Sequence, residues 1–324
     1  MIHLFDLPHA EARRLAQSGS PIFLLVNPVE YHGPHLSLHN DRLISLGLMR
    51  ALHTKLVETH PEWSLVLADD LEMGVDPCPG PGSRHTPFAD VRAQVMTACR
   101  ALADLGAQRV VLMTFHGSPL HGVALHAGTK LLQDRGVRAL SPFNLLMHFM
   151  MDFNAEDWVE RFGSHADTPE REAALRGLQT DFHAGYFETS LALHFAPDSV
   201  DPAHVNLPPC PPLPMRGPIE LARRGAQLLG QKRMAGDLFL ASAGTAWNLL
   251  RPFPGYTGQP HLARATDGAA FAAELLARYV TATEAVFAGA PPPEPVMGWL
   301  EWLSLRGRIL HQDVPLAEMG PRGA

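Results

Sequence analysis

The sequence has little that would point to disulfides, nucleic acid or a membrane. Its three cysteines lie far apart without CxxC spacing, which argues against a disulfide framework and against a thiolate metal site. Lysine and arginine together number 26 against 33 acidic residues, so the formal charge of −7 offers no electrostatic attraction for nucleic acid. No apolar run is long enough to span a bilayer, and the first residues lack a basic segment followed by an apolar one. These absences predict a cytoplasmic protein with neither nucleic acid nor a membrane as partner.

The composition is otherwise ordinary for a globular protein. Hydrophobic residues make up 46% of the 324 residues and charged residues 18%, which is enough apolar side chain for a sizeable core at this length. We find no internal repeat in the sequence. We expect one domain over residues 1–290, followed by a proline-rich linker and a helical tail over residues 291–324.

Acidic and histidine side chains are concentrated between residues 28 and 41, directly after the apolar run 22–26. Gly33 and Pro34 break any helix there, because proline lacks the backbone N–H and glycine costs backbone entropy. We therefore expect a loop leaving a strand, a usual place for a functional site on a rigid scaffold. The candidate ligands in this loop are Glu30, His32, His35, His39 and Asp41. Carboxylates and imidazoles without thiolates suit zinc, manganese or iron.

A solvated loop is the alternative for each of these residues taken singly, because lone acids and histidines in loops are commonly exposed. The chain also holds 18 histidines, which raises the chance of a fortuitous cluster. One glutamate, one aspartate and three histidines within fourteen residues nevertheless favour a divalent metal site.

Alternating apolar strands and helices indicate the fold. Strands are expected at 22–26, 64–68, 109–115 and 137–140, and helices at 41–58, 88–105 and 120–134. This order is typical of an α/β protein with a mostly parallel sheet, in which ligands bind beyond the carboxyl ends of the strands. Glu30 and His116 each follow such a strand. The expected topology therefore brings both residues to the same edge of the sheet.

The rest of the chain is less regular. Residues 143–180, which include Trp158, are expected to form either a flap at the mouth of the site or a pair of amphipathic surface helices. Further helices are expected at 219–234, 267–288 and 297–310. The last of these is expected to dock on the body of the protein or on a neighbouring subunit through its apolar face.

Three motifs, in the same order, resemble those of the creatininase (creatinine amidohydrolase) superfamily. The first is Glu30-Tyr31-His32-Gly33-Pro34-His35-Leu36 with Asp41, similar to the family's E-x-H-G-P-H-L-P-x-x-x-D. The second is His116-Gly117 after a buried strand, similar to its N-G-H-G-G-N. The third is His183-Ala184-Gly185-x-x-Glu188-Thr189-Ser190, similar to its H-A-G-x-x-E-T-S. The resemblance extends over most of the chain.

The resemblance implies a three-layer α/β/α sandwich with a mostly parallel central sheet, assembled as a homo-oligomer, a hexamer in the family. It implies one or two divalent metals per chain, zinc first, with manganese or iron as alternatives. The implied metal ligands are Glu30, His32, Asp41, His116 and Glu188. Asp41 would bridge two ions, His183 would be the catalytic acid/base, and His39 is left without a chemical role. Substrate contacts are expected from His35, Ser118, Trp158 and Tyr186.

The implied activity is hydrolysis of a non-peptide C–N bond in a small molecule, namely a cyclic amide, lactam or formamide. A divalent ion lowers the pKa of bound water to about 7 and polarises a carbonyl oxygen. Metal-bound hydroxide would then attack the amide while His183 relays a proton to the leaving nitrogen. Two alternatives stay open: a peptidase acting on a modified precursor peptide, and a metal-binding family member without catalytic activity.

Departures around the second motif argue against creatininase activity itself. Thr114 and Phe115 stand where the family has Asn-Gly, and Ser118 stands where creatinine-hydrolysing members have a glutamate. Because this motif borders the expected pocket, we expect a different substrate. His121 and His126 follow on the next helix, and for both a surface position is favoured over a place in the pocket.

Overall fold

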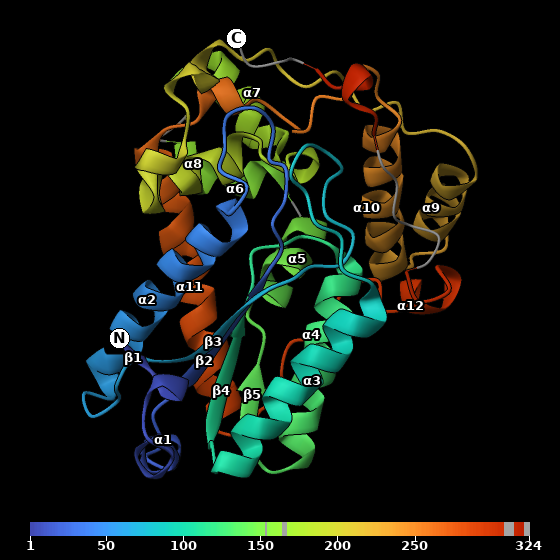
Figure 1. Ribbon diagram of the computed structural model, residues 1–324. Coiled ribbons are helices and arrows are strands. Elements are labelled where there is room, and N and C mark those ends of the chain that lie inside the picture. The colour runs from blue at the N-terminus through green and yellow to red at the C-terminus, as the bar shows by residue number, and fades with distance from the viewer. Residues whose placement is uncertain (153, 164–166, 308–313, 321–324) are drawn as a thin grey trace.

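The protein is built around a five-stranded parallel sheet (Figure 1). The computed structural model describes residues 1–152, 154–163, 167–307 and 314–320. The strands are β1 (Ile2–His3), β2 (Ile22–Asn27), β3 (Val66–Glu72), β4 (Arg109–Met113) and β5 (Arg138–Leu140). They lie in the order β1-β3-β2-β4-β5, and every neighbouring pair is parallel. The parallel sheet predicted from the sequence is confirmed, and only the two-residue edge strand β1 was not expected.

Helices cover both faces of the sheet. One face carries α2 (Asn40–Thr59), α8 (Tyr186–Phe195) and α11 (Ala265–Phe287), and the other carries α1 (His9–Ala16), α3 (Phe88–Leu105) and α4 (Pro119–Asp134). Phe23 of β2 packs in the first layer and Leu24 in the second, because successive side chains of a strand point to opposite faces. The structure is therefore the α/β/α sandwich that the resemblance implies.

The order of the strands determines where a ligand is expected to bind. From β2 the chain passes to β3 on one side of β2 and later to β4 on its other side. In open α/β sheets, ligands bind beyond the carboxyl ends of the strands at such a reversal. The carboxyl ends of β2 and β4 lie side by side there, with Leu25 in register with Met113.

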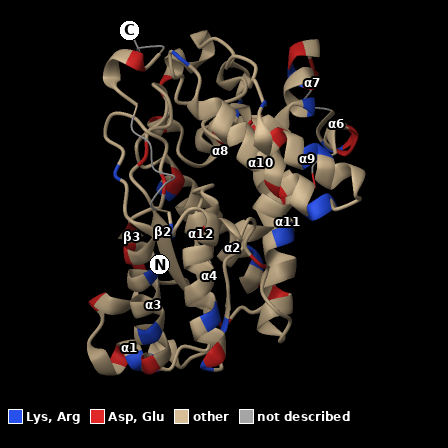
Figure 2. Ribbon diagram, turned by 90° about the vertical axis from the view of Figure 1, so that its right-hand side faces the viewer, with Lys and Arg blue, Asp and Glu red and all other residues tan. Residues whose placement is uncertain are grey.

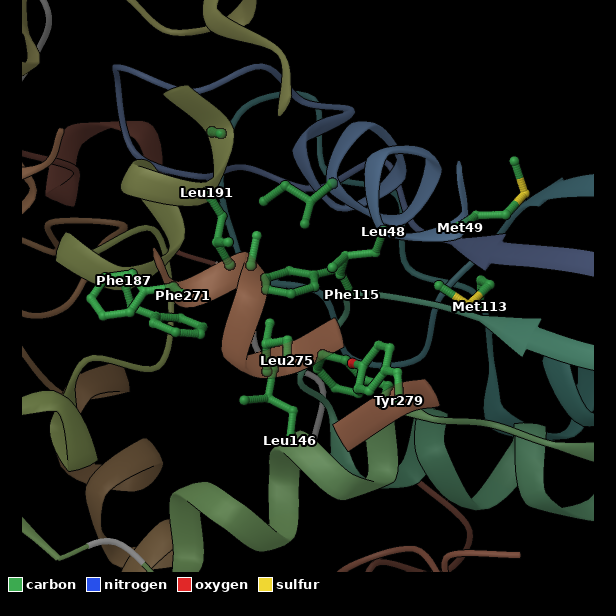
Figure 3. Close-up of a cluster of buried hydrophobic side chains, with 14 of the residues drawn as sticks. Leu48, Met49, Met113, Phe115, Leu146, Phe187, Leu191, Phe271, Leu275 and Tyr279 are labelled. Carbon is green, nitrogen blue, oxygen red and sulfur yellow. The ribbon is translucent and has the colours of Figure 1, made fainter. Parts of the chain in front are cut away.

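A buried apolar cluster attaches α8 to the sheet (Figure 3). Phe187 and Leu191 of α8 pack with Phe271 and Leu275 of α11, and Met113 of β4 belongs to the same cluster. Burying each of these side chains contributes about 1.5–3 kcal/mol relative to leaving it exposed. This packing fixes the position of the first turn of α8 relative to the end of β4.

The middle of the chain, for which a flap at the mouth of the site and a pair of surface helices were the alternatives, is largely helical. It contains α5 (Phe143–Met151), α6 (Ala155–Phe162) and α7 (Pro169–Arg176). Trp158 of α6 is buried and stacks on Phe149 of α5 with ring centroids 4.8 Å apart. The segment therefore contributes to the core as well as to the surface.

Two later expectations need correction. The single helix expected at 219–234 is instead a pair, α9 (Pro218–Leu228) and α10 (Lys232–Asn248), separated by a turn in which Gly230 has a positive φ of 69°. The helix expected at 297–310 is described only as the single turn α12 (Leu300–Leu303), and residues 308–310 lie outside the described part. Trp299 does dock on the body, since its indole N–H donates to Asp237 of α10 at 2.7 Å. The division into residues 1–290 and 291–324 stays a prediction.

The outer surface carries charges of both signs. Figure 2 shows acidic and basic positions together on α1. Within the described ranges, no helix combines the length and the apolar character needed to cross a membrane.

Gly268 allows α11 to approach α8 closely. A Cβ at this position would lie 1.9 Å from the backbone oxygen of Ser190, so a helix would have to move to accept it. We expect Gly268→Ala to lower the free energy of unfolding by about 3 kcal/mol. Gly225→Ala in α9 is the matched control, because no described atom lies within 4 Å of that position and alanine favours the helix by up to about 1 kcal/mol. Chemical denaturation checks both variants, and equal midpoints would contradict this account of the packing.

Candidate metal centre

Segments that are distant in the sequence meet at the carboxyl ends of β2 and β4. The loop after β2, the first turn of α2, the segment after β4, the segment that leads into α8 and the first turn of α8 all contribute. The titratable side chains that meet there are Glu30, His32, Asp41, His116, His183 and Glu188, each at most 8% exposed. Burying so many ionisable groups is costly unless they are paired or coordinate a metal.

The two helix starts hold their carboxylates in place. Asp41 and Glu188 lie in the first turns of α2 and α8, where free backbone N–H groups and the helix dipole favour negative charge. Glu188 accepts hydrogen bonds from the Asn40 amide at 2.7 Å and from the Ala184 N–H at 2.6 Å. Ala184 has a positive φ of 48°, an uncommon conformation for a residue with a Cβ. Such local strain is typical of functional sites.

Each of the three histidines in the cluster donates one ring N–H to a backbone carbonyl. Because a carbonyl oxygen only accepts, this contact fixes which nitrogen carries the proton in the neutral ring. The other nitrogen then presents a lone pair to the cluster, as in histidines that bind metals. The contacts are His32 Nδ1 to Glu30 O at 3.0 Å, His116 Nε2 to Val75 O at 2.8 Å and His183 Nε2 to Tyr31 O at 2.9 Å.

These lone pairs face carboxylate oxygens. His32 Nε2 lies 3.0 Å from Asp41 Oδ1 and 3.2 Å from Glu188 Oε1. His116 Nδ1 lies 2.8 Å from Glu30 Oε2 and 3.5 Å from Asp41 Oδ2, and among the described residues neither of these two oxygens has a hydrogen-bond partner. Lone pairs in this arrangement repel one another unless a cation lies between them. The geometry therefore fits a divalent metal.

The possible ligand atoms form three overlapping sets, each with all its atoms within 4.8 Å of one another. Asp41 belongs to two of the sets, and so does Glu30. Shared carboxylates of this kind suit one ion or a pair of ions, and oxygen and imidazole donors suit zinc, manganese or iron. The sets are Glu30–Asp41–His116, His32–Asp41–Glu188 and Glu30–His32–His183.

The electrostatic field of the cluster favours positive charge. Burial lowers the pKa of His32, but Asp41 and Glu188 raise it well above its ordinary value. Burial likewise raises the pKa of the Asp41 carboxyl, but the neighbouring imidazoles of His32 and His116 hold it well below its usual range. A field that holds a proton on an imidazole also stabilises a metal ion, whose binding releases that proton.

His183 differs from the other two histidines. Burial, together with a charged His32 beside it, lowers its pKa to about 4. Its ring stacks on that of His32 with centroids 4.5 Å apart, and its Nδ1 lies 3.9 Å from Glu30 Oε1. His183 is therefore neutral near pH 7, with Nδ1 free to accept a proton.

A cavity of about 630 Å³ opens from the cluster. Apolar side chains of α5, α10 and residues 297–303 form much of its wall. Ser118 also lines the cavity, and among the described residues its buried hydroxyl has no hydrogen-bond partner.

Of the four expected substrate contacts, only Ser118 lines this cavity. The ring of His35 is hydrogen-bonded to a side chain of α8, and the Tyr186 hydroxyl to one of α11. Trp158 lies in an aromatic cluster with residues of α5, α8 and α11. These three side chains are buried between helices, where they hold the elements of the site together.

The expected surface position of His121 is wrong. His121 is fully buried, its Nε2 lies 3.1 Å from the backbone oxygen of Val26, and its ring packs edge-on against His116 at 5.0 Å. The first turn of α4 faces the end of β2, so this position points inward. His126 and His39 are both partly buried, and the His39 ring lies 3.1 Å from Glu72, away from the metal cluster.

Two further residues at the site were not singled out from the sequence. The Cys78 N–H donates to Glu30 Oε1 at 2.5 Å, and a backbone donor leaves no signature in the sequence. The Trp247 ring lies 5.2 Å from that of His183. It was missed because the helix that carries it was expected to end at residue 234.

Comparison with known proteins supplies the family. The model of the creatininase family, described as creatinine amidohydrolase, matches residues 6–283. The chain belongs to the creatininase family. A solved structure described as "Creatininase Mn" has a TM-score of 0.55 and 21% identity, covering 88% of this chain and 98% of that one. A mutant creatininase described as Zn-Zn type has a TM-score of 0.56 and 21% identity, covering 89% and 99%.

A curated relative of this creatininase-family chain carries a different name. It is the mycofactocin precursor peptide peptidase of Mycobacterium ulcerans (strain Agy99). The two sequences are 25% identical over 251 residues, which cover 74% of this chain and 84% of the relative. Membership of the creatininase family therefore does not by itself specify the substrate.

Proposed function

We propose that this protein is a metal-dependent amidohydrolase that cleaves a non-peptide C–N bond, in a cyclic amide, lactam or formamide. The observation that carries the proposal is the buried set of three imidazole lone pairs and three carboxylates that borders a large cavity. The ligands of one or two divalent ions would be Glu30, His32, Asp41, His116 and Glu188. Zinc is proposed first, with manganese or iron as alternatives, and the manganese and Zn-Zn forms of creatininase support this choice.

The metal supplies one part of the chemistry, since a bound divalent ion lowers the pKa of water and polarises an amide carbonyl. The protein supplies the proton transfer. His183 Nδ1 accepts a proton from the attacking water and returns it to the leaving nitrogen, while the Tyr31 carbonyl holds the ring in the required tautomer. The water oxygen joins the acyl carbon and the C–N bond breaks, which gives a carboxylic acid and an amine; in a cyclic amide or lactam both groups stay in the ring-opened product.

The second candidate is a peptidase that acts on a modified precursor peptide. The mycofactocin precursor peptide peptidase supports it, and so does a cavity larger than one small cyclic amide requires. Both candidates use the same metal centre and the same proton transfer, so they differ only in substrate. A homo-oligomer, with a hexamer as the specific expectation, stays a prediction that light scattering of the purified protein tests.

Replacing His183 tests the proposed chemistry. The metal-loaded protein is assayed against formamides, lactams, cyclic amides and short peptides, before and after chelation. We expect turnover of at least one non-peptide class, its loss on chelation, and a fall in kcat of about 100- to 10,000-fold for His183→Ala with metal retained. His39→Ala is the matched control, because this histidine lies in the same loop as Glu30 and His32 but its ring pairs with Glu72 outside the cluster.

The outcomes separate the alternatives. Unchanged turnover in His183→Ala would remove this residue from its role. Turnover of peptides alone would favour the peptidase. A metal-loaded protein that hydrolyses none of the panel would favour a family member without catalytic activity.

A further inference from the structure

We propose that the substrate carries a bulky, apolar and uncharged group beside its amide, and that the cavity next to the metal centre binds this group. The inference rests on the proposed function, because it assumes that the scissile amide lies at the metal cluster. The cavity volume of about 630 Å³ is far more than a small polar amide needs. It falls within the range of about 300–1,000 Å³ that is usual for sites of drug-sized ligands.

The walls of the cavity are apolar and come from separate parts of the chain. Methionines 147, 150 and 151 of α5 form one side, and Leu238 and Phe239 of α10 contribute another. Residues 297–303, which include Leu300, form a third part of the wall. Methionine is unbranched and polarizable, so it adapts to irregular apolar shapes. Such walls favour an aromatic or branched aliphatic group without demanding one shape.

The charges around the cavity disfavour an anionic group. Among the described residues that line it there is no lysine and no arginine. Its carboxylates are Glu30, Asp41, Asp76, Asp181 and Glu188. Divalent ions would offset three of these carboxylates, and Asp181 accepts the N–H groups of Tyr186 and Phe187. A substrate carboxylate inside the cavity would lose its hydration without gaining a cationic side chain such as arginine.

The side chain that the cavity offers to the substrate amide as a hydrogen-bond partner is uncharged. Ser118 lines the cavity two residues after His116, and among the described residues its hydroxyl has no hydrogen-bond partner, so it can donate to or accept from an amide. Neutral amides with a bulky apolar substituent fit this combination. Amino acids and peptides whose free carboxylate would have to enter the cavity do not.

Hydroxamates test the inference, because the hydroxamate group chelates a divalent metal and leaves its substituent in the cavity. Isothermal titration of the zinc-loaded protein compares acetohydroxamate, octanohydroxamate, benzohydroxamate and 4-carboxybenzohydroxamate. We expect each methylene of the octanoyl chain that becomes buried to tighten binding by about two- to fourfold. We expect benzohydroxamate to bind at least about tenfold more tightly than either acetohydroxamate or its 4-carboxy analogue.

Two variants test whether the apolar wall of the cavity determines these affinities. Met150→Lys places a cation on the apolar wall, so we expect weaker binding of benzohydroxamate, tighter binding of the 4-carboxy analogue and unchanged binding of acetohydroxamate. Leu229→Lys is the matched control, because this residue is 75% exposed and does not line the cavity. It is expected to change none of the affinities.

The results distinguish this inference from the proposed function. If acetohydroxamate binds as tightly as the larger hydroxamates, or the carboxylate is tolerated, the inference is overturned while the metal centre stands. If the protein retains no zinc and binds no hydroxamate, the proposed function fails and the inference fails with it.

Discussion

Replacing Asp41 by asparagine is expected to reduce the metal content of the purified protein and to lower kcat/KM by more than about a hundredfold. Asp41 lies between His32 and His116, and each of its oxygens faces one of their ring nitrogens. Loss of residues that merely orient metal ligands already costs about 10- to 100-fold in affinity or activity, so loss of Asp41, which we propose to be a ligand, is expected to cost more. The substitution keeps the volume of the side chain and removes its charge.

Thermal unfolding with and without added zinc provides the measurement. A metal that binds only the folded state raises its stability by an amount that depends on affinity, so the unmodified protein is expected to gain more from zinc than Asp41→Asn. His39→Asn, two residues away but with its ring paired to Glu72 outside the cluster, is expected to gain as much as the unmodified protein. An equal gain for Asp41→Asn would contradict a role for Asp41 as ligand.

Replacing Asp267 by alanine is expected to destabilise the fold by about 3–5 kcal/mol without any direct effect on the metal. Asp267 is buried at the start of α11, where one of its oxygens accepts from Arg171 at 2.9 Å and from the Tyr186 hydroxyl at 2.8 Å. Arg171 is itself only 7% exposed, so removing the carboxylate leaves a buried cation without its closest partner. Urea denaturation measures the loss.

Two controls separate the effect of breaking the ion pair from the effect of removing side-chain atoms. Replacing Arg171 by methionine and Asp267 by leucine together removes both charges, and we expect this double variant to be much less destabilised than Asp267→Ala alone. Glu274→Ala, also on α11, removes a carboxylate that pairs with Arg161 and Arg278, and it is expected to cost less than Asp267→Ala, because both arginines keep at least a third of their side chains in water. A double variant that is as unstable as Asp267→Ala would contradict the pairing argument.

Local patterns in the sequence were sufficient for most of the sheet and for the helices around it. Strands β2 and β4 are continuous apolar runs, and α3 ends at Gly106, which adopts the left-handed conformation typical of a helix end. The pattern failed where no local signal exists. Two residues carry no periodicity, so β1 was missed, and the continuation of α10 beyond residue 234 depends on packing against the rest of the protein.

The candidate site, too, was predicted from the sequence only in part. Its six titratable residues lie in short motifs, and the position of each motif at a strand end or a helix start follows from the α/β topology. The orientation of the rings does not, because it depends on the backbone carbonyls of Glu30, Val75 and Tyr31. The roles expected for Trp158 and Tyr186 overlooked the large apolar area that such rings bury, which favours a place in the core.

Metal analysis of the purified, untagged protein tests the central claim most directly. The elements bound per chain are measured after extensive dialysis without chelator, and again after treatment with a strong chelator. We expect at least one zinc, manganese or iron ion per chain before chelation, and a fall in thermal stability and amide hydrolysis when it is removed. A protein that holds no metal, and whose stability and activity do not change on chelation, would contradict the account.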